Sequence, residues 1–346
     1  MGKPLYDITQ CALYKVTSKV RLASLLHVSV PAVLGMAKSR KYREFPIKEK
    51  VCPFTGKTTK ERWVQTPAEA LRPLHDRILD LLKRVAPPSY AHAAVKGKSY
   101  RSNAAAHKNS AEVATFDLSS FYPSTSENAV FRFFADQLLC APDIAGLFAR
   151  LVCVEVPGSH PCLPTGSPLS PLISIYANKP MFDALERLAS KSGLVFTCYI
   201  DDITFSGQAI PAGLTNIVTS LVKRYGHTLA VKKTRIFSNA DAKHITGVVV
   251  HNGRVSVPNS RFRKARKIQL AIEAETDKLK KIQLMQKLNG LLGEAAYLDP
   301  KYKTLAKRSY RSLADLRNNT PTITGSQSFT DVSQLAGFKV DDSLPF

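Results

Sequence analysis

Two acidic residues interrupt the most apolar stretch of the chain. Residues 194–200 form a nearly continuous apolar run, as expected of a β-strand that is buried on both faces. Asp201 and Asp202 follow directly, and the apolar character resumes over residues 203–205. Two residues between short apolar runs match the length of a tight hairpin turn, and aspartate tolerates the positive φ that such turns need. The pattern predicts a strand–turn–strand unit with carboxylates at its tip.

A third aspartate ends another predicted strand, over residues 113–117, earlier in the chain. Asp117 lies between Phe116 and Leu118, and an unpaired carboxylate at a buried strand end is costly unless a positive charge compensates it. Three carboxylates can hold two Mg²⁺ ions about 3.5–4 Å apart, which is the two-metal arrangement for phosphoryl transfer. The expected ligands of two Mg²⁺ ions, or of Mn²⁺ in their place, are Asp117, Leu118, Asp201 and Asp202.

The charge balance of the chain indicates a polyanionic partner. Its 346 residues include 49 Lys and Arg against 27 Asp and Glu, a formal net charge of +22. Nucleic acid is the first candidate, and a membrane surface is the rival. We expect no membrane partner, because no run approaches the roughly 20 apolar residues of a membrane span. The six cysteines are scattered without a C-x-x-C pair, which favours a reducing cytoplasm.

Four segments of the chain resemble, in order, the motifs of reverse transcriptases. Residues 116–122 resemble the strand motif with the first metal aspartate, and residues 199–202 resemble the Tyr-x-Asp-Asp box. Residues 163–171 resemble the Leu-Pro-Gln-Gly-x-Pro-x-Ser-Pro box beside the nascent base pair, with Thr165 in place of the usual Gln. Residues 232–234 resemble a later motif whose lysine lies near the triphosphate.

This resemblance implies a role for each matching residue. The three aspartates would hold the metals, and Lys233 could protonate the leaving pyrophosphate. The ring of Tyr122 would exclude a ribose 2′-OH and so favour deoxynucleotides. Thr165 and Gly166 would border the incoming nucleotide, although the side-chain contacts of the family's Gln do not carry over to Thr165. Three further basic residues could clamp the triphosphate or simply be exposed hairpin charges: Lys57, Lys60 and Arg62.

Two short signatures narrow the resemblance to the retron subgroup. Residues 103–107 fit Asn-Ala-x-x-His, and residues 245–247 fit Val-Thr-Gly with Ile in place of Val. By this resemblance, the enzyme would bind its own structured non-coding RNA and begin DNA synthesis from the 2′-OH of an internal guanosine. The product would be a branched RNA–DNA hybrid (msDNA), and an effector protein encoded nearby would join it in anti-phage defence. Four residues would organise that RNA, with loop and capping roles as the alternative for the first two: Asn103, His107, Thr246 and Gly247.

A basic helical pattern begins after Pro258, with tyrosines interleaved among its later basic residues. We interpret it as an RNA surface, with a solvated helix face as the alternative. Its first basic residues are Arg261, Arg263, Arg266 and Lys267.

The expected fold is α+β, in the form of a right-hand polymerase with a mostly antiparallel palm sheet. Helices are expected over residues 18–36 and from a cap at Thr66, a hairpin over residues 45–64, and a basic loop over residues 89–110. The expected domains are an N-terminal helical region with fingers (1–110), a palm (111–240), a thumb (241–318) and a tail (319–346).

Two other functions stay open. One is a reverse transcriptase of the intron type, or another defence-associated type, that does not prime from a branch. The other is an RNA-binding protein with an inactive polymerase fold, which the intact Asp117, Asp201 and Asp202 disfavour.

Overall fold

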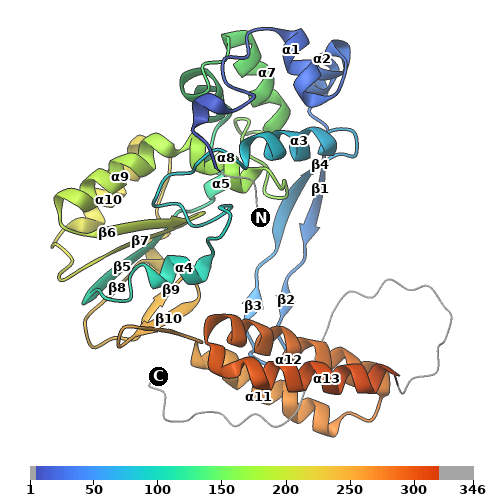
Figure 1. Ribbon diagram of the computed structural model, residues 1–346, viewed down its shortest axis with the longest axis vertical. Coiled ribbons are helices and arrows are strands. Elements are labelled where there is room, and N and C mark those ends of the chain that lie inside the picture. Colours follow the sequence, from blue (N-terminus) through green and yellow to red (C-terminus); the bar gives the residue numbers. More distant parts are fainter. Residues whose placement is uncertain (1–4, 319–346) are drawn as a thin grey trace. The chain divides into compact units, whose positions relative to one another are not determined.

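The computed structural model describes residues 5–318, and the predicted tail over residues 319–346 lies outside the described residues (Figure 1). The chain divides into two compact units. Among the described residues, the first contains 5–49 and 60–239, and the second contains 50–59 and 240–318. Helices and strands are mixed in both units, so the predicted α+β class is confirmed.

A four-stranded antiparallel sheet lies at the centre of the first unit, with strand order β6-β7-β5-β8. Its strands are β5 (Glu112–Asp117), β6 (Val195–Tyr199), β7 (Asp202–Gly207) and β8 (Arg235–Phe237). Side chains alternate between the faces of a strand. One face of this sheet carries Phe116, Phe196 and Phe205, which join one hydrophobic core with α9 (Lys179–Lys191) and α10 (Leu214–Arg224). The opposite face is left for polar residues, including Asp117 and Asp202.

A second hydrophobic core in this unit is almost entirely helical. Its elements are α1 (Lys19–Leu26), α2 (Val30–Ser39), α3 (Arg72–Leu82), α6 (Glu127–Arg132), η2 (Phe133–Gln137), α7 (Pro142–Val152) and α8 (Ser170–Ala177). The pattern over residues 18–36 is indeed helical, but it forms two helices, because His27 adopts a left-handed conformation (φ 58°) between them.

Within residues 5–318, no single helix is long and apolar enough to cross a membrane. Only α1 and α2 taken together pass that test, and they are bent by 86° at the break between them.

The predicted hairpin over residues 45–64 is present but extends further than expected. Its strands are β1 (Tyr42–Ile47) and β4 (Arg62–Pro67), and Tyr42 pairs with Pro67 at the end of the ladder. The prediction of a helix that begins at Thr66 was therefore wrong. Cross-strand pairing keeps Thr66 and Pro67 extended, and the helix begins at Arg72 instead.

Two short helices connect these larger elements in the first unit: α4 (Tyr100–Ala105) and α5 (Phe121–Ser124). The first lies within the segment predicted as a loop. Its reciprocal capping box is formed by Ser99 and Ser102. Ser102 stands where that motif usually has Glu or Gln, so the sequence does not reveal the start of the helix.

The second unit combines short strands with a basic helical bundle. Its strands are β2 (Lys50–Val51), β3 (Thr58–Thr59), β9 (Lys243–Ile245), β10 (Val248–His251) and β11 (Arg254–Ser256). Its helices are α11 (Asn259–Ala274), α12 (Lys278–Leu298) and α13 (Lys303–Asn318), which pack against one another through apolar residues such as Phe262, Leu288 and Leu313. Single 3₁₀ turns complete the chain: η1 (Ile8–Gln10), η3 (Val231–Lys233) and η4 (Pro300–Tyr302).

Candidate active site

Strand pairing brings the predicted aspartates together at one end of the central sheet. In the β5–β7 ladder, Asp117 lies directly opposite Asp202. Residues opposite each other in an antiparallel pair point to the same face, so their carboxylates share the polar face of the sheet. The backbone N–H of Leu118 donates to the carbonyl of Asp201 over 2.9 Å, which fixes the third aspartate beside the other two.

The turn between β6 and β7 is strained at an unexpected residue. Tyr199 pairs with Asp202, which leaves Ile200 and Asp201 as the two turn residues. The positive φ belongs to Ile200 (59°), so the expectation that an aspartate would adopt it was wrong. A β-branched residue with positive φ is a genuine backbone outlier, and such strain costs on the order of 1–3 kcal/mol. It presents Asp201 and Asp202 together at the start of β7.

Burial and mutual repulsion disfavour the charged forms of two of these carboxyls. Burial, then the neighbouring Asp201 and Asp117, raise the pKa of Asp202 to about 7. Burial is also the largest cause that raises the pKa of Asp201. Lys233 is a cation beside them: its Nζ lies 2.6 Å from Oδ2 of Asp117, and this hydrogen bond raises the pKa of the lysine. The site holds more negative charge than one lysine can offset.

The donor set suits hard divalent cations, since it consists of carboxylate oxygens. Within residues 5–318, no three or more His, Cys, Asp or Glu side chains are grouped so that they could hold a metal ion. Here Lys233 occupies one oxygen of Asp117, and its side chain is 65% exposed and so can move away. The pKa values of Asp201 and Asp202 are raised because both carboxyls are buried and lie beside other carboxyls whose negative charge is not neutralised. A cation held by Asp117, Asp201 and Asp202 would relieve this repulsion, and it would require Lys233 to leave Asp117.

Tyr122 lies next to the same carboxylates. Burial is the main cause that raises the pKa of its hydroxyl, and the second cause is the charge of Asp201. Its ring centroid lies 5.9 Å from that of Phe121, which anchors it against the hydrophobic core below the sheet. This position is consistent with the predicted role against the sugar.

The loop that carries Thr165 and Gly166 is pressed against β4. The N–H of Gly166 donates to the carbonyl of Gln65 over 2.9 Å. A Cβ at Gly166 would lie 2.6 Å from Thr66 Cγ2 and 2.8 Å from the Gln65 carbonyl oxygen, so only glycine fits. The Thr165 hydroxyl lies 3.1 Å from Oε1 of Gln65. The strand and the loop thus form one rigid wall.

A buried histidine that the sequence did not single out holds the same loop from its other side. His75 Nε2 lies 2.9 Å from the Leu151 carbonyl, which can only accept, so this nitrogen is protonated. His75 Nδ1 therefore accepts from the Ser167 hydroxyl over 2.7 Å, and burial lowers the pKa of His75 to about 4. In the sequence, His75 is only a lone histidine on an apolar helix face, and this pattern does not reveal that its partner lies 92 residues away.

The burial of Asn103 and His107 corrects their predicted role as RNA contacts. Both side chains are fully buried. His107 bridges Thr197 Oγ1 of β6 and Ser206 Oγ of β7, each over 2.7 Å, and burial lowers its pKa to about 3. This segment fastens α4 to the polar face of the central sheet. Any influence on RNA would be indirect, through the positions of β6 and β7.

In the second unit, Thr246 and Gly247 form a hairpin turn. They are the two residues between the paired Ile245 and Val248, and both have positive φ (45° and 75°), as in a type I′ turn. A guanidinium nitrogen of Arg261 lies 3.4 Å from the position that a Cβ on Gly247 would take. Arg261 also pairs with Glu294 of α12 over 2.5 Å. Arg261 thus braces this unit internally, and its predicted contact with RNA stays a prediction.

The remaining predicted contacts are exposed cations. Arg263, Arg266 and Lys267 project from α11 into solvent. The three candidates for the triphosphate are exposed too, but Lys57 lies in the second unit, whereas Lys60 and Arg62 lie in the first.

Comparison with known proteins gives one consistent type of relative. The Retron Se72 reverse transcriptase of Salmonella heidelberg is 26% identical over 68% of this chain and 64% of its own length. The Retron Ec86 reverse transcriptase of Escherichia coli is 24% identical over 70% of this chain and 74% of its own. The Retron Mx65 reverse transcriptase of Myxococcus xanthus is 31% identical over 55% of this chain and 48% of its own length. The match thus spans less than two thirds of the Se72 and Mx65 proteins. No protein-family model matches the chain.

Proposed function

Since the chain belongs to the retron reverse transcriptases, we propose that it is an RNA-directed DNA polymerase that copies a structured non-coding RNA from deoxynucleoside triphosphates. The observation that carries the proposal is the pairing of Asp117 with Asp202, with Asp201 fixed beside them. Asp117 and Asp202 on one sheet face, with Asp201 in the adjoining turn, would supply the carboxylates that phosphoryl transfer with divalent cations uses.

The residues around these carboxylates would each have a separate role in nucleotide addition. Bound to Asp117, Asp201 and Asp202, two Mg²⁺ or Mn²⁺ ions would supply charge neutralisation at the triphosphate and a lower pKa for the attacking hydroxyl. Lys233 would leave Asp117 and donate its proton toward the leaving pyrophosphate. Tyr122 would exclude the ribose 2′-OH, and the wall of Gly166 and β4 would position the nascent pair.

We assign the fingers, palm and thumb of a right-hand polymerase to residues 1–110, 111–240 and 241–318. The basic residues of α11 would hold the RNA backbone, with Arg263, Arg266 and Lys267 as the contacts. We further propose that the enzyme acts in the cytoplasm, with an effector protein encoded nearby, in defence against phage.

We propose that DNA synthesis begins at the 2′-OH of an internal guanosine, which leaves a 2′–5′ branch. Family membership supports this priming, as do the two signature segments at 103–107 and 245–247. The burial of His107 and the turn at Gly247 give these signatures a positioning role, since about 1 Å of misplacement can reduce a rate on the order of a hundredfold.

The test is to extract nucleic acid from cells that express the chain with its neighbouring locus, and to treat it with debranching enzyme. A mobility shift that releases free DNA supports branched priming. DNA with an ordinary 5′ end, unchanged by the treatment, would assign the chain to reverse transcription without a branch. Absence of any DNA product, together with retained RNA binding, would favour an inactive RNA-binding protein.

A further inference from the structure

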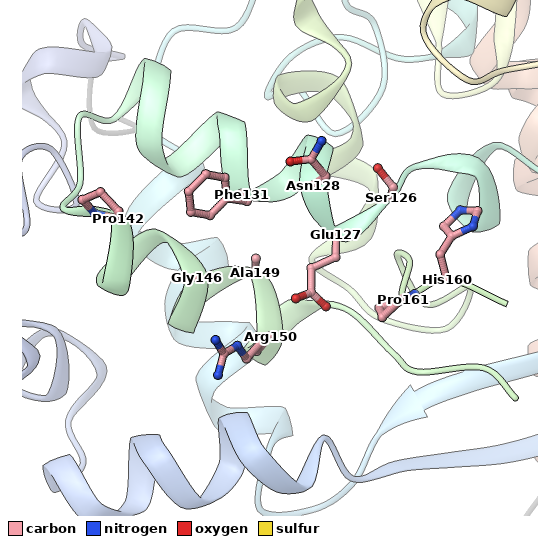
Figure 2. Close-up of a pocket in the computed structure, with 10 residues that line it drawn as sticks. All are labelled: Ser126, Glu127, Asn128, Phe131, Pro142, Gly146, Ala149, Arg150, His160 and Pro161. Atoms are coloured by element: carbon pink, nitrogen blue, oxygen red, sulfur yellow. The ribbon is translucent and has the colours of Figure 1, made fainter.

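A hollow of about 510 Å³ opens in the first unit, and its lining includes none of the residues of the active site. Figure 2 shows the lining side chains, which come from three segments: Asn128 and Phe131 from α6, Ala149 and Arg150 from α7, and His160 from the loop that follows. Cavities of about 300–1,000 Å³ are typical of small-ligand sites. The hollow is therefore large enough for one nucleotide.

The floor of the hollow is open because a glycine occupies the middle of α7. No atom lies within 4 Å of the position that a Cβ on Gly146 would take. Glycine in a helix interior costs roughly 0.5–1 kcal/mol relative to alanine, and here no neighbour requires it for packing. A side chain at this position would enter the hollow and occupy its space.

The charges at the rim leave one cation available. Glu127 borders the hollow, but Arg40 contacts both of its carboxylate oxygens, one of them over 3.2 Å. Arg40 also lies 3.3 Å from Glu155. Arg150 is exposed, and it forms no ion pair with any residue between 5 and 318. Glu127 is thus paired with an arginine that it shares with Glu155, and Arg150 is the cation that an anionic ligand would meet.

We propose that this hollow binds one unpaired nucleotide of an RNA strand. The half-buried ring of Phe131 offers a stacking surface, the amide of Asn128 can bond a base edge, and Arg150 can pair with a phosphate. The inference rests on the proposed RNA partner, and it adds a contact in the first unit to those proposed for the basic helices of the second unit. A peptide would need a longer groove than a hollow of this volume provides.

The test uses a 12-nucleotide RNA of adenosines with one central 4-thiouridine, crosslinked to the full-length protein by near-ultraviolet light. Crosslinked peptides are mapped by mass spectrometry. The wild-type protein should yield adducts within residues 126–131 or 160–161. Gly146→Leu should lower their yield about tenfold. Gly35→Leu is the matched control, since Gly35 is also helical and without atoms within 4 Å of its Cβ position, and it should change nothing.

Arg150→Gln, expected to lower the yield about fivefold, decides the question if Gly146→Leu does not fold. Adducts that are absent from these segments, or that persist in both variants, overturn the proposal. Displacement of the RNA by an acidic 12-residue peptide at lower concentration than by unlabelled RNA overturns it in favour of a protein partner.

Primer extension at saturating primer–template keeps the two proposals apart. It should stay within twofold of wild type in Gly146→Leu, and its absence in the wild type refutes the polymerase proposal alone.

Discussion

Replacing Gly166 by alanine should disable the proposed polymerase site through a single added methyl group. The Cβ would lie 2.6 Å from Thr66 Cγ2, 2.7 Å from Val64 Cγ1 and 2.8 Å from the Gln65 carbonyl oxygen. All three separations are shorter than real Cβ contacts, and one involves backbone, which cannot rotate away. The loop and β4 must therefore separate, by an amount on the order of 1 Å.

The size of the effect follows from that displacement. Overpacking of a close-fitting contact costs typically 1–3 kcal/mol. Separation would also lengthen the hydrogen bond from Gly166 to Gln65, which is 2.9 Å in the wild type. A displacement of about 1 Å beside the reacting groups can reduce the rate on the order of a hundredfold. Catalysis should therefore suffer much more than folding.

The assay compares single-nucleotide incorporation and urea unfolding for wild type, Gly166→Ala and the control Gly35→Ala. The control adds the same methyl group to a helix position with no atom within 4 Å, and it should retain full activity. A triple variant with Val64→Ala and Thr66→Ser removes two of the three clashes and should recover part of the rate. Wild-type incorporation by Gly166→Ala would refute the proposed contact between loop and strand.

Three further predictions concern the sugar, the carboxyls and the RNA. Tyr122→Ala should admit ribonucleotides, and unchanged discrimination between dNTP and rNTP would mean that the ring only fills the core. The pKa of Asp202 is raised to about 7 from its usual value near 4, so the folded state binds more protons than the unfolded state between those pH values. In EDTA, the unfolding free energy of the wild type should therefore fall by about 2–3 kcal/mol between pH 5 and pH 8, a fall that urea titrations should find missing in Asp202→Asn. Neutralising Arg263, Arg266 and Lys267 together should reduce the slope of log affinity against log salt by about two. An unchanged slope would place the RNA elsewhere.

The sequence predicted the central hairpin well because its signal is local. The apolar run before Asp201 and the apolar residues after Asp202 set both strands, β6 and β7, within a residue or two. The α+β class followed from the same alternation of strands and helical patterns. The strained Ile200 could not be predicted, because turn propensities assign positive φ to aspartate before isoleucine.

Long-range contacts account for the other differences. Thr66 has the sequence of a helix cap, but β1 pairs with its segment and keeps it extended. His107 lies in a segment of small residues without periodicity, so its burial between Thr197 and Ser206 leaves no local signal. The pairing of Arg261 with Glu294 likewise depends on how two helices pack, which a basic helical pattern alone does not reveal.

Primer extension on an RNA template tests the central claim most directly. Wild type, Asp201→Asn and Asp202→Asn would be compared with an annealed DNA primer, four dNTPs and Mg²⁺, and RNA binding would be measured in parallel. The wild type should extend the primer to the end of the template. Both variants should lose at least a thousandfold in rate, on the order of 4 kcal/mol of transition-state stabilisation, while they bind RNA normally. Extension by either variant at a rate near that of the wild type would contradict the assignment of these carboxylates to catalysis.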